Sequence, residues 1–492
     1  MNLHTSEVLT HTQIQSGQKY ILKDSLAGEA MVNLSGGAFI TAMAIHLGAS
    51  NFQIGLLASL PILTNIFQLI SIWLVQRYAN RRGVAVVSSF LGRFPMLFAG
   101  FLPFMFSTAV GLKLLLAILF LHYFFGSIAG ASWNAWVKDL IPENNLGSFF
   151  SQRTKLVTIL SAVLSLGVSF IIDFVKANHN NHLTLTYYTI FVIGGIVGLI
   201  GVYWLSRAPE PTPLTVNENV FKQFKKPLKD KNFRNLLKFN AAWSFALNLA
   251  APFFTVFLMK TIGFPLSYVI GFTILAQISN ILTIKKLGKY TDRYSNKTII
   301  NICAPVYVAC ILAWTYAAMP DNRFYSLLIL IVISIFSGVA TGGVNLALNN
   351  IGMKLAPRRE AMAYMSSLNM VVAFFSALSP MLGGLFADFF ATHQFVSNFQ
   401  WKGSEGVHTL EMIDLQGWSF LFIIGGLMAL ASLRLLASVK EQGEINKEKV
   451  MLYMKVRLRK RIKTNSDTIR SGIIKPVNKV QTILRYKQPE TL

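Results

Sequence analysis

Twelve runs of mostly apolar residues constrain this chain more than any other feature of its sequence. A run of about 20 such residues is long enough to cross a bilayer as a helix, and a soluble core does not need so many. Only 13% of the 492 residues are charged, against roughly 25% in a typical soluble domain. The sequence therefore predicts an all-α membrane protein with twelve transmembrane helices. We place them near residues 27–48, 52–76, 84–106, 112–138, 154–177, 184–206, 235–261, 266–284, 297–319, 324–352, 361–390 and 416–438.

Two turns between these expected helices have similar sequences about 215 residues apart. A leucine, a proline, an aromatic residue and a serine recur at one constant offset: Leu140, Pro142, Phe149 and Ser151, then Leu355, Pro357, Tyr364 and Ser366. Gly55 and Gly271 form another pair, one residue further apart. Duplication inside a membrane chain points to a transporter, whose similar halves rock about a site between them. We expect two pseudo-symmetric six-helix bundles, residues 27–206 and 235–438, joined by a cytoplasmic linker, 207–234.

The net charge of +24 would suggest nucleic-acid binding in a soluble chain, but its distribution argues against that partner. Basic residues crowd alternate connections between the expected helices, which is the positive-inside pattern. This pattern predicts that both termini are cytoplasmic, in a plasma (inner) membrane. Residues 1–26 are polar and form a short cytoplasmic segment without the apolar core of a cleaved signal peptide.

The chain ends in a basic tail, residues 439–492, in which apolar and basic side chains alternate between Val450 and Lys463. As a helix, this stretch could lie on an anionic inner leaflet of the bilayer. A solvated tail that only enforces topology explains the same pattern equally well.

One connection carries a family signature. Gly288, the Asp292-Arg293 pair and Lys297 resemble a loop motif of the major facilitator superfamily. The corresponding turn of the first half keeps the basic pair Arg81 and Arg82, but Trp73 and Arg77 replace the glycine and the aspartate. The segment from Asp139 to Arg153 is also similar to that superfamily's turn after the fourth helix. With the duplicated six-helix pattern, the resemblance extends over residues 27–438.

The resemblance implies two six-helix bundles and alternating access by a rocker-switch motion. It also implies an ion-pair latch at the cytoplasmic helix ends, made in one state and broken in the other. Asp292, Arg293 and Lys297 would form one latch, and Asp139 with Arg153 a candidate opposite. Arg81 and Arg82 belong to the same gating set, or they are plain positive-inside charges.

In this fold the substrate cavity is lined by helices 1, 2, 4 and 5 of one half and 7, 8, 10 and 11 of the other. Polar groups at membrane depth are costly and usually face a cavity or a partner. We expect an amide-rich lining suited to a neutral or zwitterionic organic molecule, although each amide could instead bond a neighbouring helix. The candidate substrate-binding residues are Asn33, Asn65, Gln68, His122, Tyr123, Trp243, Asn248, Gln277, Asn345 and Asn369.

Ionisable residues are scarce in the expected spans. Arg93 is expected to be a structural partner, for which Glu29 is the candidate. A proton-coupled carrier needs a group whose pKa changes between the two states, and Glu29 and His122 are the candidates. The lack of a carboxylate near mid-membrane leaves uniport open.

These features predict secondary active or facilitative transport of a small organic solute, with no metal and no cofactor. The aromatic and amide-rich lining favours export slightly over uptake. Pro380, Gly383 and Gly384 resemble an antiporter element, which we interpret first as packing or a hinge. A non-transporting sensor on a carrier fold is the alternative. An intramembrane enzyme is less favoured, because the sequence has no H-E-x-x-H, no G-x-S-x-G and no paired aspartates. The sequence has no P-loop for ATP-driven transport either.

Overall fold

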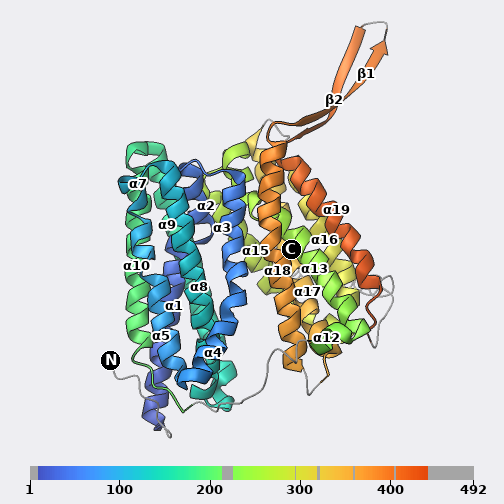
Figure 1. The fold of residues 1–492 in the computed structure, drawn as a ribbon. Helices are drawn as coiled ribbons and strands as arrows, with labels where there is room; N and C mark the ends of the chain where they lie inside the picture. The colour runs from blue at the N-terminus through green and yellow to red at the C-terminus, as the bar shows by residue number, and fades with distance from the viewer. Residues whose placement is uncertain are drawn as a thin grey trace, which may run out of the picture.

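The computed structural model describes residues 9–212, 225–293, 295–318, 322–357, 361–403 and 406–441, which are almost entirely helical. The basic stretch between Val450 and Lys463 lies outside these residues, as does part of the expected linker. Figure 1 shows the N-terminal and C-terminal halves side by side.

The N-terminal half contains six membrane-crossing segments, three of them interrupted. Its elements are α1 (His11–Ser35), α2 (Gly37–His46), α3 (Asn51–Leu63), η1 (Thr64–Phe67), α4 (Gln68–Tyr78), α5 (Arg81–Arg93), α6 (Met96–Ala99), α7 (Leu102–Met105), α8 (Thr108–Leu140), α9 (Glu143–Asn178), η2 (Asn180–His182) and α10 (Leu183–Leu205).

The C-terminal half also contains six membrane-crossing segments. Its elements are α12 (Lys225–Lys229), α13 (Lys231–Ala250), α14 (Phe253–Val256), η3 (Phe257–Ile262), α15 (Leu266–Arg293), α16 (Asn296–Ala313), η4 (Trp314–Tyr316), α17 (Arg323–Leu355), α18 (Ala361–Phe390) and α19 (Trp418–Ala437).

Among the described residues, ten helical segments are long and apolar enough to cross a membrane. The broken segments α1–α2 and α5–α7 supply the first and third crossings, so the expected twelve-helix fold is confirmed. Gly37, with φ +54°, follows the break between α1 and α2. Pro95 precedes α6 and lacks the N–H that would continue α5.

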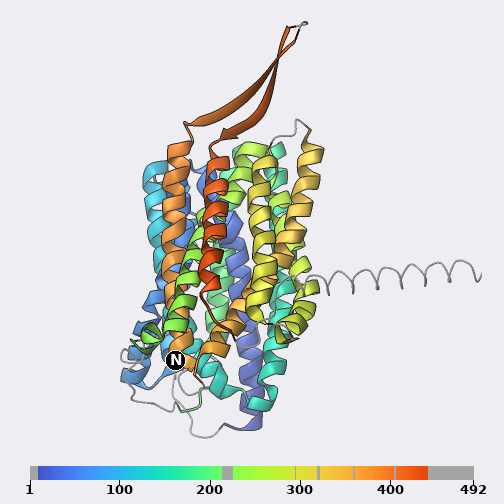
Figure 2. The same ribbon diagram turned by 90° about the vertical axis from the view of Figure 1, so that its right-hand side faces the viewer.

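Two differences from the expected elements are the start of α1 and the connection after α18. Helix α1 begins at His11 rather than near residue 27, because Thr10 and Gln13 form a capping box and Ile21 is fully buried. The connection after α18 holds an antiparallel hairpin, β1 (Gln394–Gly403) and β2 (Gly406–Gln416), where no strand was expected. Figure 2 shows this hairpin projecting beyond the helix ends.

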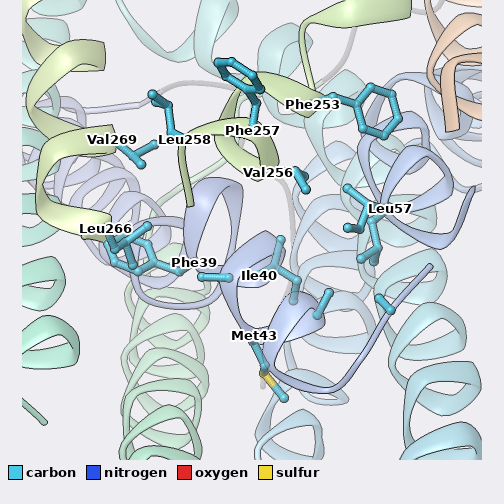
Figure 3. Packing of buried hydrophobic residues seen from close by; sticks show 14 of the residues in the cluster. Phe39, Ile40, Met43, Leu57, Phe253, Val256, Phe257, Leu258, Leu266 and Val269 are labelled. Carbon is cyan, nitrogen blue, oxygen red and sulfur yellow. The ribbon is translucent and has the colours of Figure 1, made fainter. Parts of the chain in front are cut away.

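The hydrophobic cores show how the halves are joined. One core contains residues of both halves, among them Phe39, Met43, Phe253 and Phe257, which Figure 3 shows packed together. A second core lies wholly within residues 233–439, and a third wholly within residues 21–208. The halves therefore share a core at one end, near the start of α3, and have separate cores at the other, which we call the basic end.

Small residues bring α3 and α18 close together at the joined end. A Cβ atom on Gly55 would overlap the carbonyl oxygen of Pro380, and one on Gly384 would come within 2.5 Å of the carbonyl oxygen of Asn51. The Pro380–Gly384 element therefore serves as packing between the halves. Gly271 has no such neighbour, so the Gly55–Gly271 pair does not share a packing role.

Two carboxylates also connect the halves at the joined end. Asp388, near the end of α18, accepts hydrogen bonds from the backbone N–H groups of Asn51 and Phe52. Asp173, near the end of α9, accepts them from Leu266 and Ser267. Each carboxylate caps the first turn of a helix in the opposite half, where backbone N–H groups otherwise lack partners.

Candidate functional site

A cavity of about 470 Å³ opens into the N-terminal half between α1, α5, α8 and α9. Met31, on its wall, belongs to the core that the two halves share. Trp133 and Phe150, also on its wall, pack against the separate N-terminal core. The cavity therefore lies at the level where the shared core ends.

Arg93, which is partly buried, and the buried Asp24 form an ion pair in the wall of the cavity. Nη1 of Arg93 lies 2.8 Å from Oδ1 of Asp24 and donates to the carbonyl oxygen of Gly198 at 2.9 Å. A Cβ atom on Gly201 would lie 2.7 Å from that nitrogen, so the glycine makes room for the guanidinium. Arg93 is paired with Asp24, so the expected pairing with Glu29 is wrong.

Glu29 is held by Asn33, one turn further along α1. Nδ2 of Asn33 donates to Oε1 of Glu29 at 2.9 Å. Oδ1 of Asn33 accepts hydrogen bonds from Ser161 and Ser165 of α9, at 2.9 and 2.7 Å. Asn33 thus ties α1 to α9 and orients Glu29, which lines the cavity.

Arg153 reaches the cavity from α9. Its Nε donates to Oγ of Ser25 at 2.7 Å, and its guanidinium carbon lies 5.0 Å from the ring centroid of Trp133. Within the described residues, its two terminal amino groups have no hydrogen-bond partner. Asp139 is bonded to Arg81 instead, so the expected Asp139–Arg153 latch is not formed in this state.

His122 lies on the same wall of α8 as two glycines. Its Nδ1 donates to the carbonyl oxygen of Gly92 at 2.9 Å, which orients the ring. Gly126 and Gly130 line the cavity, and a Cβ atom on either would meet no atom within 4 Å. The missing side chains therefore add open volume rather than close helix packing. Tyr123 stacks edge-on against His122 and packs against the shared core.

The other expected site residues lie elsewhere. Trp243 is only 2% exposed and packs against Phe239 and Tyr307 in the C-terminal core. Asn248 donates to the carbonyl oxygen of Ser244 and to Oγ of Ser376. Five further amides are exposed on spans of both halves and do not line this cavity: Asn65, Gln68, Gln277, Asn345 and Asn369.

At the basic end, the arginines at the start of α5 bond within their own half. Glu210 accepts hydrogen bonds from the backbone N–H groups of Arg81 and Arg82, at 2.8 and 3.0 Å. The Arg81 side chain pairs with Asp139 and with Glu210. Arg82 also donates to the carbonyl oxygen of Ser206.

The C-terminal half repeats this arrangement around Glu441. Its carboxylate accepts from the backbone N–H groups of Asn296 and Lys297 and pairs with Lys354 at 3.0 Å. Nζ of Lys297 donates to the carbonyl oxygen of Val439 at 2.9 Å. The side chains of Asp292 and Arg293 lie outside the described part of the chain, so their expected latch stays a prediction.

Sequence analysis missed five residues that organise these sites: Asp24, Ser25, Trp133, Glu210 and Glu441. Asp24 lies 69 positions from Arg93 in the chain, and Glu210 lies 129 positions from Arg81. Neither carboxylate has a local motif that reveals its partner. Only the starts of α5 and α16 gave a signal. The side chains of Asn80 and Ser295 each cap one backbone N–H there, and the other N–H groups of the first turn still require acceptors.

Solved structures of several known transporters have a similar fold. The structure of the nucleoside transporter NupG superposes with a TM-score of 0.59 at 15% identity, over 88% of this chain and 100% of that one. The inward-open xylose transporter XylE from E. coli gives 0.57 at 13% identity, over 90% and 98%. An inward-facing bacterial homologue of the human lysosomal transporter Spinster gives 0.54 at 15%, over 77% and 82%. At these identities the likeness establishes the fold alone.

The sequence comparisons agree with this fold. No curated protein matches the chain. The family model of the Major Facilitator Superfamily matches residues 27–380, which is most of the membrane-spanning part. The chain therefore belongs to the Major Facilitator Superfamily and is a membrane transporter rather than an enzyme.

Proposed function

We propose that this chain carries a small polar organic solute across the membrane by alternating access. The observation that supports this most directly is the arrangement of the cores, one shared at the joined end and two separate at the basic end. Such a molecule can rock about its joined end without disrupting the packing inside either half.

The orientation follows from charge. Basic residues lie at or near helix ends at the basic end, and the positive-inside rule assigns that end to the cytoplasm. Examples are Arg81, Arg82, Lys138 and Lys354. Both termini are then cytoplasmic, and the present state faces inward. In the outward-facing state the charges at this end, including Asp292, Arg293 and Lys297, rearrange into contacts between the halves.

The solute binds in the cavity of the N-terminal half and moves along a polar route between the halves. Glu29, His122 and Arg153 supply the charged and hydrogen-bonding groups. The five exposed amides support a polar route, because an amide that faces lipid is costly. Glu29 and His122 are the groups available for proton coupling, and export remains slightly favoured over uptake because of the aromatic residues beside the amides.

Counterflow in proteoliposomes tests this function. Vesicles are loaded with a mixture of unlabelled amino acids, nucleosides and sugars, and the uptake of each isotopically labelled counterpart is followed. We expect saturable uptake of at least one class, accelerated by the same solute inside, with none in protein-free vesicles. Uptake that no internal solute accelerates would argue against alternating access, and the absence of uptake for all three classes would contradict the proposed transport of such solutes.

A further inference from the structure

We propose that the cavity of the N-terminal half binds an amino-acid-like zwitterion, with its carboxylate on Arg153 and its ammonium group on Glu29. This inference rests on the proposed function, for which it names the substrate class. Binding at equilibrium does not require transport, so the two proposals can be tested separately.

The charges that line the cavity leave one group of each sign for a ligand. Asp24 and Arg93 neutralise each other at 2.8 Å. Among the described residues, Glu29 has no ion pair, and neither has Arg153. A neutral zwitterion satisfies both and leaves the net charge unchanged. A simple anion or a simple cation would pair with only one of these two half-buried groups and would change the net charge of the cavity.

Arg153 is positioned to receive a carboxylate. Ser25 holds its Nε, and the face of Trp133 supports the guanidinium plane. Phe150 packs edge-on against Trp133, with ring centroids 6.4 Å apart. The two terminal amino groups therefore remain for a ligand, and a guanidinium binds a carboxylate best through two parallel hydrogen bonds.

Glu29 is positioned to receive an ammonium group. One carboxylate oxygen is bonded to Asn33, which is itself held by Ser161 and Ser165. The other oxygen has no partner within the described residues. A carboxylate oriented in this way loses little conformational entropy when it binds, which favours affinity.

The size of the cavity sets an upper bound on the ligand. Its volume of about 470 Å³ lies in the lower part of the range of small-molecule sites, about 300–1,000 Å³. Gly126 and Gly130 leave one wall open, and Met31 with the 49% exposed Val32 offers an apolar surface. A single amino acid with an apolar side chain fits these features.

Equilibrium binding to the purified protein tests the charge requirement. The probes are L-leucine and L-phenylalanine, each compared with its amine lacking the carboxylate (3-methylbutylamine, 2-phenylethylamine) and its acid lacking the ammonium (4-methylpentanoate, 3-phenylpropionate). Isothermal titration gives each affinity. We expect at least one amino acid to bind about tenfold or more tightly than both of its analogues.

Four variants assign the binding to this cavity. Arg153→Gln and Glu29→Gln should each weaken binding of the amino acid about tenfold or more. Gly130→Val should abolish binding by filling open volume, without a clash that disturbs the fold. Gly167→Val is the matched control, because Gly167 lies on a face of α9 with the exposed apolar residues Val163, Phe170 and Phe174, which face lipid.

The outcomes separate the proposals. If neither amino acid binds the wild-type protein, or if Gly130→Val binds them normally, the zwitterion site is wrong. Transport of a nucleoside or a sugar without amino-acid binding would overturn the substrate class and leave the transport function standing. Amino-acid binding without counterflow of any solute would keep the site and overturn transport.

Discussion

Asp173 and Asp388 make the same contact in opposite directions. Asp388 of the C-terminal half caps the start of α3 at Asn51, and Asp173 of the N-terminal half caps the start of α15 at Leu266. The two aspartates are 215 residues apart, and so are the two helix starts. The internal duplication therefore extends to the interface at the joined end, which carries a reciprocal pair of charged caps.

Replacing both aspartates by asparagine should loosen the joined end. Asparagine has one acceptor oxygen and no charge, so each substitution should weaken its cap by about 1 kcal/mol. Because these caps connect the halves, the loss should shift the population towards states open at this end. Spin labels at exposed Asn180 and Lys260, one in each half, would report this as longer distances in double electron–electron resonance.

Asp230→Asn is the matched control for this measurement. Asp230 caps α13 within its own half, accepting from the backbone N–H groups of Asn232 and Phe233 at 2.9 and 3.1 Å. Its loss should lower thermal stability and leave the distance between the labels unchanged. If Asp230→Asn lengthened that distance as much as the double variant, the caps between the halves would have no special role.

Gly55→Ala should disturb the same interface by steric overlap. The added Cβ would overlap the backbone carbonyl of Pro380, which cannot rotate away. Overpacking of this kind typically costs about 1–3 kcal/mol, and we expect a lower unfolding temperature together with a less populated closed end. Gly271→Ala is the control, since its Cβ meets nothing within 4 Å and alanine is the better helix former. Equal destabilisation by the two substitutions would contradict the packing role of Gly55.

Glu441 should make stability depend on pH. Burial raises the pKa of this carboxyl, but hydrogen bonds from Lys297, Asn296 and Lys354 outweigh it and hold the pKa below its ordinary value of 4.5. A lowered pKa in the folded state stabilises the protein above the ordinary pKa, and this contribution is lost as the pH falls through the folded pKa. The unfolding temperature should therefore fall below about pH 4.5, and Glu441→Gln should lack this part of the decline. If the unfolding temperatures of wild type and Glu441→Gln fell in parallel with pH, this role of Glu441 would be refuted.

The sequence predicted the helices well where lipid imposes a long apolar run. The expected span 184–206 corresponds to α10, Leu183–Leu205, and 361–390 to α18, Ala361–Phe390. Hydropathy carries no information on the first part of α1, because residues 11–26 pack against protein through scattered positions such as Ile21. The hairpin of β1 and β2 projects beyond the helix ends, where no apolar run marks it.

The candidate site was only partly predictable, because depth in the membrane identifies costly polar groups but not their partners. Glu29 and His122 were found by that argument and do line the cavity. The same argument selected Trp243, which is a core residue, and Asn248, which bonds within its own half. Pairing of Arg93 with Asp24 depends on how α1 and α5 both pack against α10, which no local pattern encodes.

Asn33 and Asn248 separate a positioning role from a purely structural one. They are 215 residues apart, and each bonds a serine on a partner helix, Ser161 and Ser376. Either asparagine replaced by alanine should lower stability by about 0.6–1.7 kcal/mol, the range for hydrogen bonds between membrane helices. Only Asn33 also orients Glu29, so only Asn33→Ala should weaken binding of L-leucine or L-phenylalanine. Isothermal titration gives the affinity of each variant for these amino acids, and the two affinities are compared between variants that have lost the same amount of stability. If the two variants bound the amino acids equally well, Asn33 would only connect α1 to α9 and would not position Glu29 for binding.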